Sequence, residues 1–228
     1  CMMAYVLLFV PQEVRDAPTY GTFQYHPSLC PQHRGPSSIN WPIAMGKTRT
    51  GLSIFWPDDG LDEGPMMLQK TCRIGPDETL GDVYFKKLFP MGVDAMIEGL
   101  ELVKAGVIIK HNQRLEDGSY ESWFGKAAAK IDWSKPVADI YNIIRAANPA
   151  PGAWTTIDGS ELKIYDSARV DGTGTAGEVV SINEDGVTVQ AEGGRILIKR
   201  VRPADGGKTA ASEWAAAAGI NSGTKLGS

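Results

Sequence analysis

Short apolar runs separated by turn residues dominate the first half of the chain. Residues 21–25, 52–56 and 66–74 have the length and composition of β-strands, and an acidic-glycine turn lies between the last two. Residues 3–10 form another short run that we expect to be buried, although its period does not distinguish a strand from a helix. Together with a helical segment farther on, these runs predict an α/β fold for residues 1–112.

The helical segment carries a start signal and an internal breaker. Thr79 is a predicted N-cap, and Asp82 stands three residues later, where a capping box places its acidic partner. Pro90 is expected to interrupt the helix, because proline lacks the backbone N–H and clashes with the preceding turn. The part after Pro90 is predicted to bury one face formed by Met96, Ile97, Leu100 and Val103.

The second half of the chain has a different pattern of apolar and polar residues. Residues 113–130 are polar and aperiodic, which predicts an interdomain linker, and a helix with apolar residues at Val137, Ile140, Tyr141 and Ile144 follows. Glycine turns then separate short alternating strands at 154–157, 162–165, 178–182, 187–191 and 195–201, and a short helix at 210–219 ends the chain. This spacing predicts a small, OB-like β-barrel within residues 131–228.

Composition and charge narrow the possible functions. The chain has 228 residues, 43% of them hydrophobic and 22% charged, as in an ordinary globular protein. A net charge of −4 gives no general attraction to nucleic acid or to anionic membranes. The apolar N-terminal run is too short for a membrane span, and three cysteines without metal-type spacing predict reduced thiols, so we expect a cytoplasmic protein with no metal site.

Two polar constellations could carry chemistry. Gln24 and His26 lie two positions apart on a predicted strand, so both side chains face the same side, where an amide donor and an imidazole could act on one substrate. Asp62 follows His26 by 36 residues and is flanked closely by Gly60 and Gly64, which let the backbone present its carboxylate. Taken alone, each residue fits a structural loop or turn as well as a catalytic site.

Longer motifs around these residues resemble one family. The segment His26-Pro27-Ser28-Leu29-x-Pro31-x-x-Arg34-Gly35 resembles the HPSLLPxxRG loop of folate-dependent formyltransferases, and Gly60-Leu61-Asp62-x-Gly64 is similar to that family's GLDTG segment. Later segments, including 129–133, 148–154 and 199–203, resemble markers of the family's C-terminal domain. Residues 39–41 and 53–56 are most similar to the hydrolase domain of 10-formyltetrahydrofolate dehydrogenase.

The resemblance implies a site and a substrate. His26, Asp62 and Gln24 would be the catalytic set, with Gln24 at a position where transferases usually carry Asn, so the amide would have to be repositioned. The formyl donor would be 10-formyltetrahydrofolate, with no metal involved, and Arg34 would either contact the folate tail or hold the loop. The residues implied to bind folate are Ser28, Leu29, Pro31, Arg34, Gly35, Asp59 and Gly60.

The acceptor of the formyl group stays open at this point. One reading is a one-carbon enzyme that passes formyl to water or an amine. Another is methionyl-tRNA formyltransferase acting on initiator tRNA through a modest basic cluster formed by Arg195, Lys199, Arg200, Arg202 and Lys208. The resemblance also implies that the N-terminal half of a Rossmann-like catalytic domain is missing, which leaves an inactive folate- or RNA-binding fragment as a third reading. The sequence does not indicate an oligomeric state.

Overall fold

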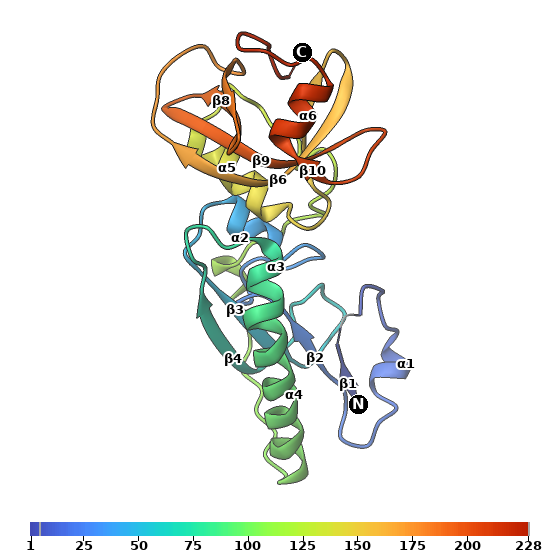
Figure 1. Cartoon of the computed structure of the whole chain (residues 1–228). Helices are drawn as coiled ribbons and strands as arrows, with labels where there is room; N and C mark the ends of the chain where they lie inside the picture. The colour runs from blue at the N-terminus through green and yellow to red at the C-terminus, as the bar shows by residue number, and fades with distance from the viewer. Residues whose placement is uncertain (5, 228) are drawn as a thin grey trace. The chain divides into compact units, whose positions relative to one another are not determined.

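The computed structural model describes residues 1–4 and 6–227, which form two compact units (Figure 1). The first unit contains residues 1–42 and 47–123, and the second contains residues 43–46 and 124–228. The division into 1–112, a linker at 113–130 and 131–228 stays a prediction about which parts of the chain fold as domains.

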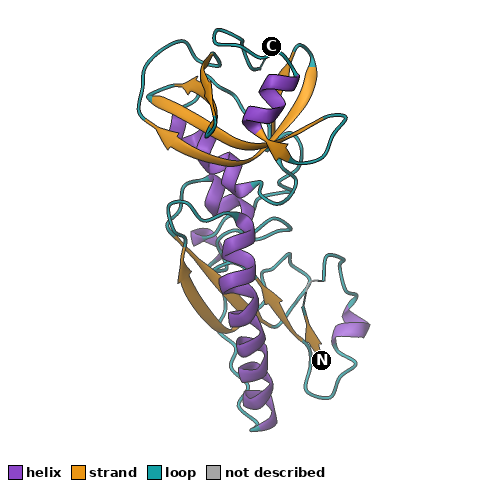
Figure 2. Cartoon of the chain, in the orientation of Figure 1, coloured by secondary structure: helices purple, strands orange, loops and turns teal. Residues whose placement is uncertain are grey.

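A four-stranded mixed sheet forms the frame of the first unit (Figure 2). Its strands are β1 (Met2–Met3), β2 (Phe23–His26), β3 (Arg49–Phe55) and β4 (Met66–Arg73), in that spatial order. β1 pairs parallel with β2, whereas the β2–β3 and β3–β4 pairs are antiparallel. The strands predicted at residues 21–25, 52–56 and 66–74 are therefore confirmed as β2, β3 and β4.

The expectation of a buried run over residues 3–10 was wrong. Only its first residue, Met3, belongs to a strand, and Leu7, Leu8 and Phe9 are exposed; Tyr5 lies outside the described residues. The short helix α1 (Gln12–Arg15) follows, and its Arg15 guanidinium lies 5.8 Å from the centroid of the Phe9 ring. A run of apolar residues shows only that burial is possible, and its partner must come from elsewhere in the fold.

The predicted helix begins as expected but is not interrupted at Pro90. Thr79 and Asp82 form the capping box at the start of α3 (Leu80–Val83), which confirms that prediction. A π-helical turn (Tyr84–Leu88) follows, and α4 (Phe89–Lys104) continues the axis with Pro90 in its first turn. The wider turn accommodates a residue without a backbone N–H, so the helix continues through the proline.

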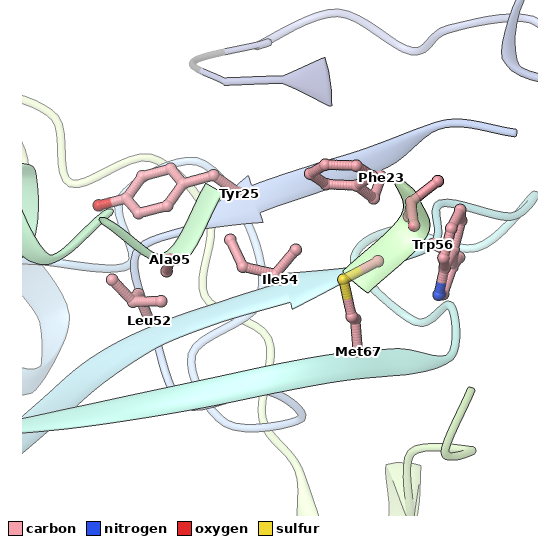
Figure 3. Packing of buried hydrophobic residues seen from close by; sticks show 8 residues of the cluster. Phe23, Tyr25, Leu52, Ile54, Trp56, Met67 and Ala95 are labelled. Atoms are coloured by element: carbon pink, nitrogen blue, oxygen red, sulfur yellow. The ribbon is translucent and has the colours of Figure 1, made fainter. Parts of the chain in front are cut away.

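One face of α4 packs on the sheet and closes the core of the first unit. Phe23 and Tyr25 from β2 and Leu52 and Ile54 from β3 lie beneath Ala95 of the helix. Figure 3 shows these side chains converging in one cluster, which Trp56 and Met67 complete. The buried face of α4 consists of Gly92, Ala95, Gly99 and Val103. The predicted face was wrong at Ile97, which is 55% exposed. In the part of the chain that the structure describes, no helix is long and apolar enough to cross a membrane.

The second unit is an antiparallel sheet with helices. The two predicted helices are found as α5 (Val137–Ala146) and α6 (Ala211–Ala217). The five predicted strands are β5 (Ala153–Ile157), β6 (Ser160–Val170), β7 (Val179–Asn183), β8 (Gly186–Ala191) and β9 (Gly194–Pro203), and the two-residue strand β10 (Thr209–Ala210) was not predicted. The strand order is β5-β6-β9-β8-β7, with β10 paired to β9. Among the described residues no pairing joins β5 to β7, so the predicted closed barrel is not confirmed and the sheet is open.

Candidate active site

Side chains of β3 and β4 form hydrogen bonds with the backbone of the loop that follows β2. Ser53 on β3 donates to the Ser28 carbonyl at 2.7 Å and accepts the Cys30 N–H at 3.1 Å. Gln69 on β4 donates to the Cys30 carbonyl at 2.6 Å. Ser28 is fully buried and donates to the Gln32 carbonyl at 2.8 Å. Burial also raises the pKa of the Cys30 thiol to about 12, so this cysteine is a neutral packing residue.

β2 ends at His26, whose two ring nitrogens face different partners. Nε2 lies 3.1 Å from the backbone carbonyl of His33. Nδ1 lies 3.6 Å from Oδ2 of Asp62, and both side chains are less than a tenth exposed. The Gly35 N–H donates to the same Asp62 oxygen at 2.9 Å. The structure therefore brings together the histidine and the aspartate that the sequence singled out.

The backbone around Asp62 is bent to present this carboxylate. Asp62 has a φ of +56°, a left-handed conformation that Asp and Asn tolerate better than most residues. Gln113 donates to the carbonyls of Asp62 and Gly64 at 3.0 and 2.7 Å, which ties down the turn. A Cβ on Gly64 would stand 1.9 Å from the Trp56 carbonyl oxygen, so only glycine allows this approach.

A buried arginine holds the other side of the same turn. Arg15 donates to the carbonyl of Asp58 and, at 2.6 Å, to the Asp59 carboxylate, whose side chain is otherwise 80% exposed. The Asp58 carboxylate accepts the Gly60 N–H at 2.9 Å. The predicted folate-binding residue Asp59 thus lies in a turn that Arg15 fixes in place.

Residues 119–121 pair with the loop after β2. Arg34 forms an ion pair with Glu63, and its backbone N–H donates to the Ser119 carbonyl at 3.1 Å. The side chain of His33 lies with Nδ1 3.2 Å from Oε2 of Glu121. Both the side chain and the backbone of Arg34 are therefore bonded within this part of the first unit.

A pocket of about 380 Å³ opens beside His26 and Asp62. Its size is within the range of small-molecule sites, roughly 300–1,000 Å³. The predicted site residues that line it are Gln24, His26, Gly35, Gly60 and Asp62. Those that the structure places outside the lining are Ser28, Leu29, Pro31, Arg34 and Asp59. Apolar walls come from Leu8, Phe9, Phe55, Leu61, Tyr120 and Trp123. Across residues 1–4 and 6–227, no cluster of three or more His, Cys, Asp or Glu side chains could hold a metal ion.

Several residues of this site were missed by the sequence analysis. Four side chains form hydrogen bonds with the loop after β2 or with the turn that carries Asp62: Arg15, Gln113, Ser119 and Glu121. The last three lie in the polar stretch predicted as a linker. Such residues have no hydrophobic period, and their hydrogen bonds cross about 50 to 90 positions of sequence, so no local pattern could have indicated them.

Comparison with known proteins identifies the family. The sequence profile described as formyl transferase matches residues 1–98, and the profile of the formyl transferase C-terminal domain matches residues 125–219. Methionyl-tRNA formyltransferase from Geotalea daltonii is 34% identical over 218 residues, which cover 96% of this chain and 70% of that protein. The chain therefore belongs to the formyl transferase family.

Two further comparisons show how the chain relates to longer proteins. Mitochondrial 10-formyltetrahydrofolate dehydrogenase from Mus musculus is 35% identical over 216 residues, which cover 90% of this chain. The chain spans only about a quarter of that protein's length (23%). Among solved structures, HypX from Aquifex aeolicus in complex with tetrahydrofolic acid has a TM-score of 0.77 at 20% identity over 94% of this chain and 38% of its own. At that identity the match supports the shared fold.

Proposed function

We propose that this chain handles the formyl group of 10-formyltetrahydrofolate and passes it to water or an amine, with His26 and Asp62 acting on the reacting atoms. One observation carries the proposal: His26 Nδ1 and Asp62 Oδ2 lie 3.6 Å apart, buried, on the wall of a pocket. Family membership supports the reaction class, and the names of the 10-formyltetrahydrofolate dehydrogenase and of the HypX complex with tetrahydrofolic acid support folate as the formyl carrier.

The chemistry divides between the two sides of the formyl carbon. A water or amine held by Asp62 attacks the carbonyl carbon, and the His26–Asp62 pair takes the proton that the nucleophile loses. A positive charge developing on His26 would be stabilised by the carboxylate 3.6 Å away. The bond from carbon to N10 of the folate then breaks, and N10 receives the proton, so that water gives formate and tetrahydrofolate.

Gln24 is the residue that we propose to assist at the formyl oxygen. It lies on β2 two residues before His26, and both side chains line the same pocket. An amide N–H aimed at a developing oxyanion lowers the barrier because the donor is already oriented. Gln24 would supply this donor at the position where the transferases that this sequence resembles usually carry Asn.

The test compares this chain with Asp62→Asn and Asp62→Ala in assays of formate release from 10-formyltetrahydrofolate. Asparagine keeps the shape and accepts the Gly35 N–H but cannot take a proton, so we expect a loss of about 10²–10⁴-fold in kcat for both variants. Asp94→Asn, an exposed substitution on α4, is the matched control and should leave the rate unchanged. Full activity of Asp62→Asn would refute the proposed role of the pair.

A second candidate acceptor is the amino group of initiator methionyl-tRNA. The match to a methionyl-tRNA formyltransferase over 96% of this chain favours it, and Lys199, Arg200 and Arg202 are exposed along β9. Phosphate contacts by such a strip predict RNA binding that weakens steeply with salt. Formyl transfer that requires tRNA, lost on replacing the three β9 residues by Ser, would favour this acceptor over water. A folded chain without turnover of either kind would leave a binding fragment.

A further inference from the structure

His33 and Glu121 together hold the backbone carbonyl that lies against His26 Nε2. His33 is a buried residue with a φ of +55°, a left-handed conformation that residues other than glycine adopt uncommonly. This backbone conformation directs the His33 carbonyl oxygen to within 3.1 Å of His26 Nε2. A buried residue keeps a strained conformation only where its surroundings hold it there.

Two hydrogen-bonding contacts hold His33 in this conformation, and a third hydrogen bond fixes its partner Glu121. The His33 N–H donates to Ser119 Oγ at 3.0 Å, and its ring Nδ1 lies 3.2 Å from the Glu121 carboxylate. The Glu121 N–H donates in turn to the Arg34 carbonyl at 3.1 Å, which fixes Glu121 against the loop. The side chains of His33 and Glu121 are 11% and 13% exposed, so water screens their contact little.

Both groups that face the ring, the His33 carbonyl and the Asp62 carboxylate, can only accept a hydrogen bond. The carbonyl lies at hydrogen-bonding distance from Nε2 (3.1 Å) and the carboxylate lies beyond it from Nδ1 (3.6 Å), so the geometry favours the proton on Nε2. In the neutral ring, Nε2 is then protonated and Nδ1 has the free lone pair. That lone pair is on the side of Asp62, where a proton from the attacking nucleophile would arrive. The opposite tautomer would present an N–H to Asp62 and could not accept this proton.

We infer that His33 and Glu121 are positioning residues that fix the tautomer of His26 through the His33 carbonyl. The inference rests on the proposed function for its kinetic consequence, but the tautomer itself can be observed without any turnover. Neither residue need touch the substrate, since Glu121 orients His33 and His33 orients His26.

The test is ¹⁵N NMR of the histidine rings, because the two ring nitrogens of each tautomer have very different shifts. The chain has three histidines, and His111→Gln removes the exposed one, which leaves two rings to assign. At mildly alkaline pH we expect the Nε2–H form for His26 and the Nδ1–H form for His33. A predominantly Nδ1–H ring at His26 in the unmodified site would overturn the inference whatever the variants do.

The variants separate positioning from mere packing. Glu121→Ala and His33→Gly should let the carbonyl turn away, mix the tautomers of His26, and lower kcat about 10–100-fold with KM changed less than about twofold. Glu121→Gln keeps an oxygen that accepts the His33 N–H and should restore both the spectrum and the rate. Glu116→Ala, an exposed carboxylate in the same segment, is the matched control and should change neither.

The outcomes are distinguishable. A pure Nε2–H tautomer in Glu121→Ala and His33→Gly would overturn the inference, whether or not kcat falls. Mixed tautomers with unchanged kcat in an active protein would overturn the kinetic role. Mixed tautomers in a chain whose unmodified form has no turnover would refute the proposed function while the positioning contact stands.

Discussion

Gly35 has a backbone conformation that favours glycine, and its N–H binds the carboxylate of the candidate catalytic residue Asp62. Its φ is +103°, outside the range that other residues adopt readily, and a Cβ there would stand 2.5 Å from the Glu121 carbonyl oxygen. Its N–H also donates to Asp62 Oδ2. Gly35→Ala should therefore cost about 1–3 kcal/mol in backbone strain and about 1.5–3 kcal/mol if the bond to the carboxylate is lost.

Gly106 provides the matched control for this substitution. It follows α4 with a φ of +76°, and a Cβ there would meet nothing within 4 Å. Gly106→Ala should cost only the backbone term, about 1 kcal/mol, because the glycine ends a helix in open space. The excess cost at Gly35, about 1.5–5 kcal/mol, then measures the close approach and the hydrogen bond.

Hydrogen exchange read by mass spectrometry on peptides from β2 and β3 reports this cost for the first unit alone. That choice avoids treating a chain with two compact units as one cooperative transition. We expect faster exchange in Gly35→Ala than in Gly106→Ala, together with loss of formyl-group activity only in the former. Equal protection in the two variants would refute the reasoning, since it would mean that the loop moves aside without cost.

Two further predictions concern titratable groups. Hydrogen bonds from Lys86 and from Thr79 lower the pKa of Asp82 to about 2 from 3.8, so its contribution to stability is complete above pH 3.8 and is lost as the pH falls toward 2. The difference in hydrogen-exchange protection of the β2 and β3 peptides between the unmodified chain and Asp82→Asn should therefore shrink over that range, and a constant difference would contradict the assignment. Burial raises the pKa of Cys30 to about 12, so a thiol reagent at mildly alkaline pH should label exposed Cys1 at once and Cys30 only after unfolding; labelling of both at equal rates in the folded chain would contradict this.

The elements of the fold were predictable where local chemistry determines them. The capping box of Thr79 and Asp82, the amphipathic helix α5 and the hairpin strands around Asp158-Gly159 all follow from residues within a few positions of one another. Closure of the second sheet was not predictable in this way. Whether β5 meets β7 depends on strand tilt and twist over the whole sheet, which alternation along a single strand does not encode.

In the candidate site, too, local sequence predicted some features and others depend on contacts from distant parts of the chain. The spacing of Gln24 and His26 on one strand, and the glycines around Asp62, indicated which side chains could be presented to a substrate. The folate-binding set drawn from the family motif includes Ser28, which the structure buries in a network with Ser53. A motif therefore identifies a loop, while the separation of its members into lining and support depends on contacts from other strands.

The parallel bridge between Arg34 and Tyr120 has a practical consequence for recombining members of this family. Residues 119–121 come after α4, yet they complete the walls and supports around His26. A chimera joined near residue 112 would give His33 a foreign acidic partner, or none, while leaving every motif residue unchanged. A junction after Trp123 would transfer the histidine together with the segment that holds its neighbour, so donor chains should be exchanged there.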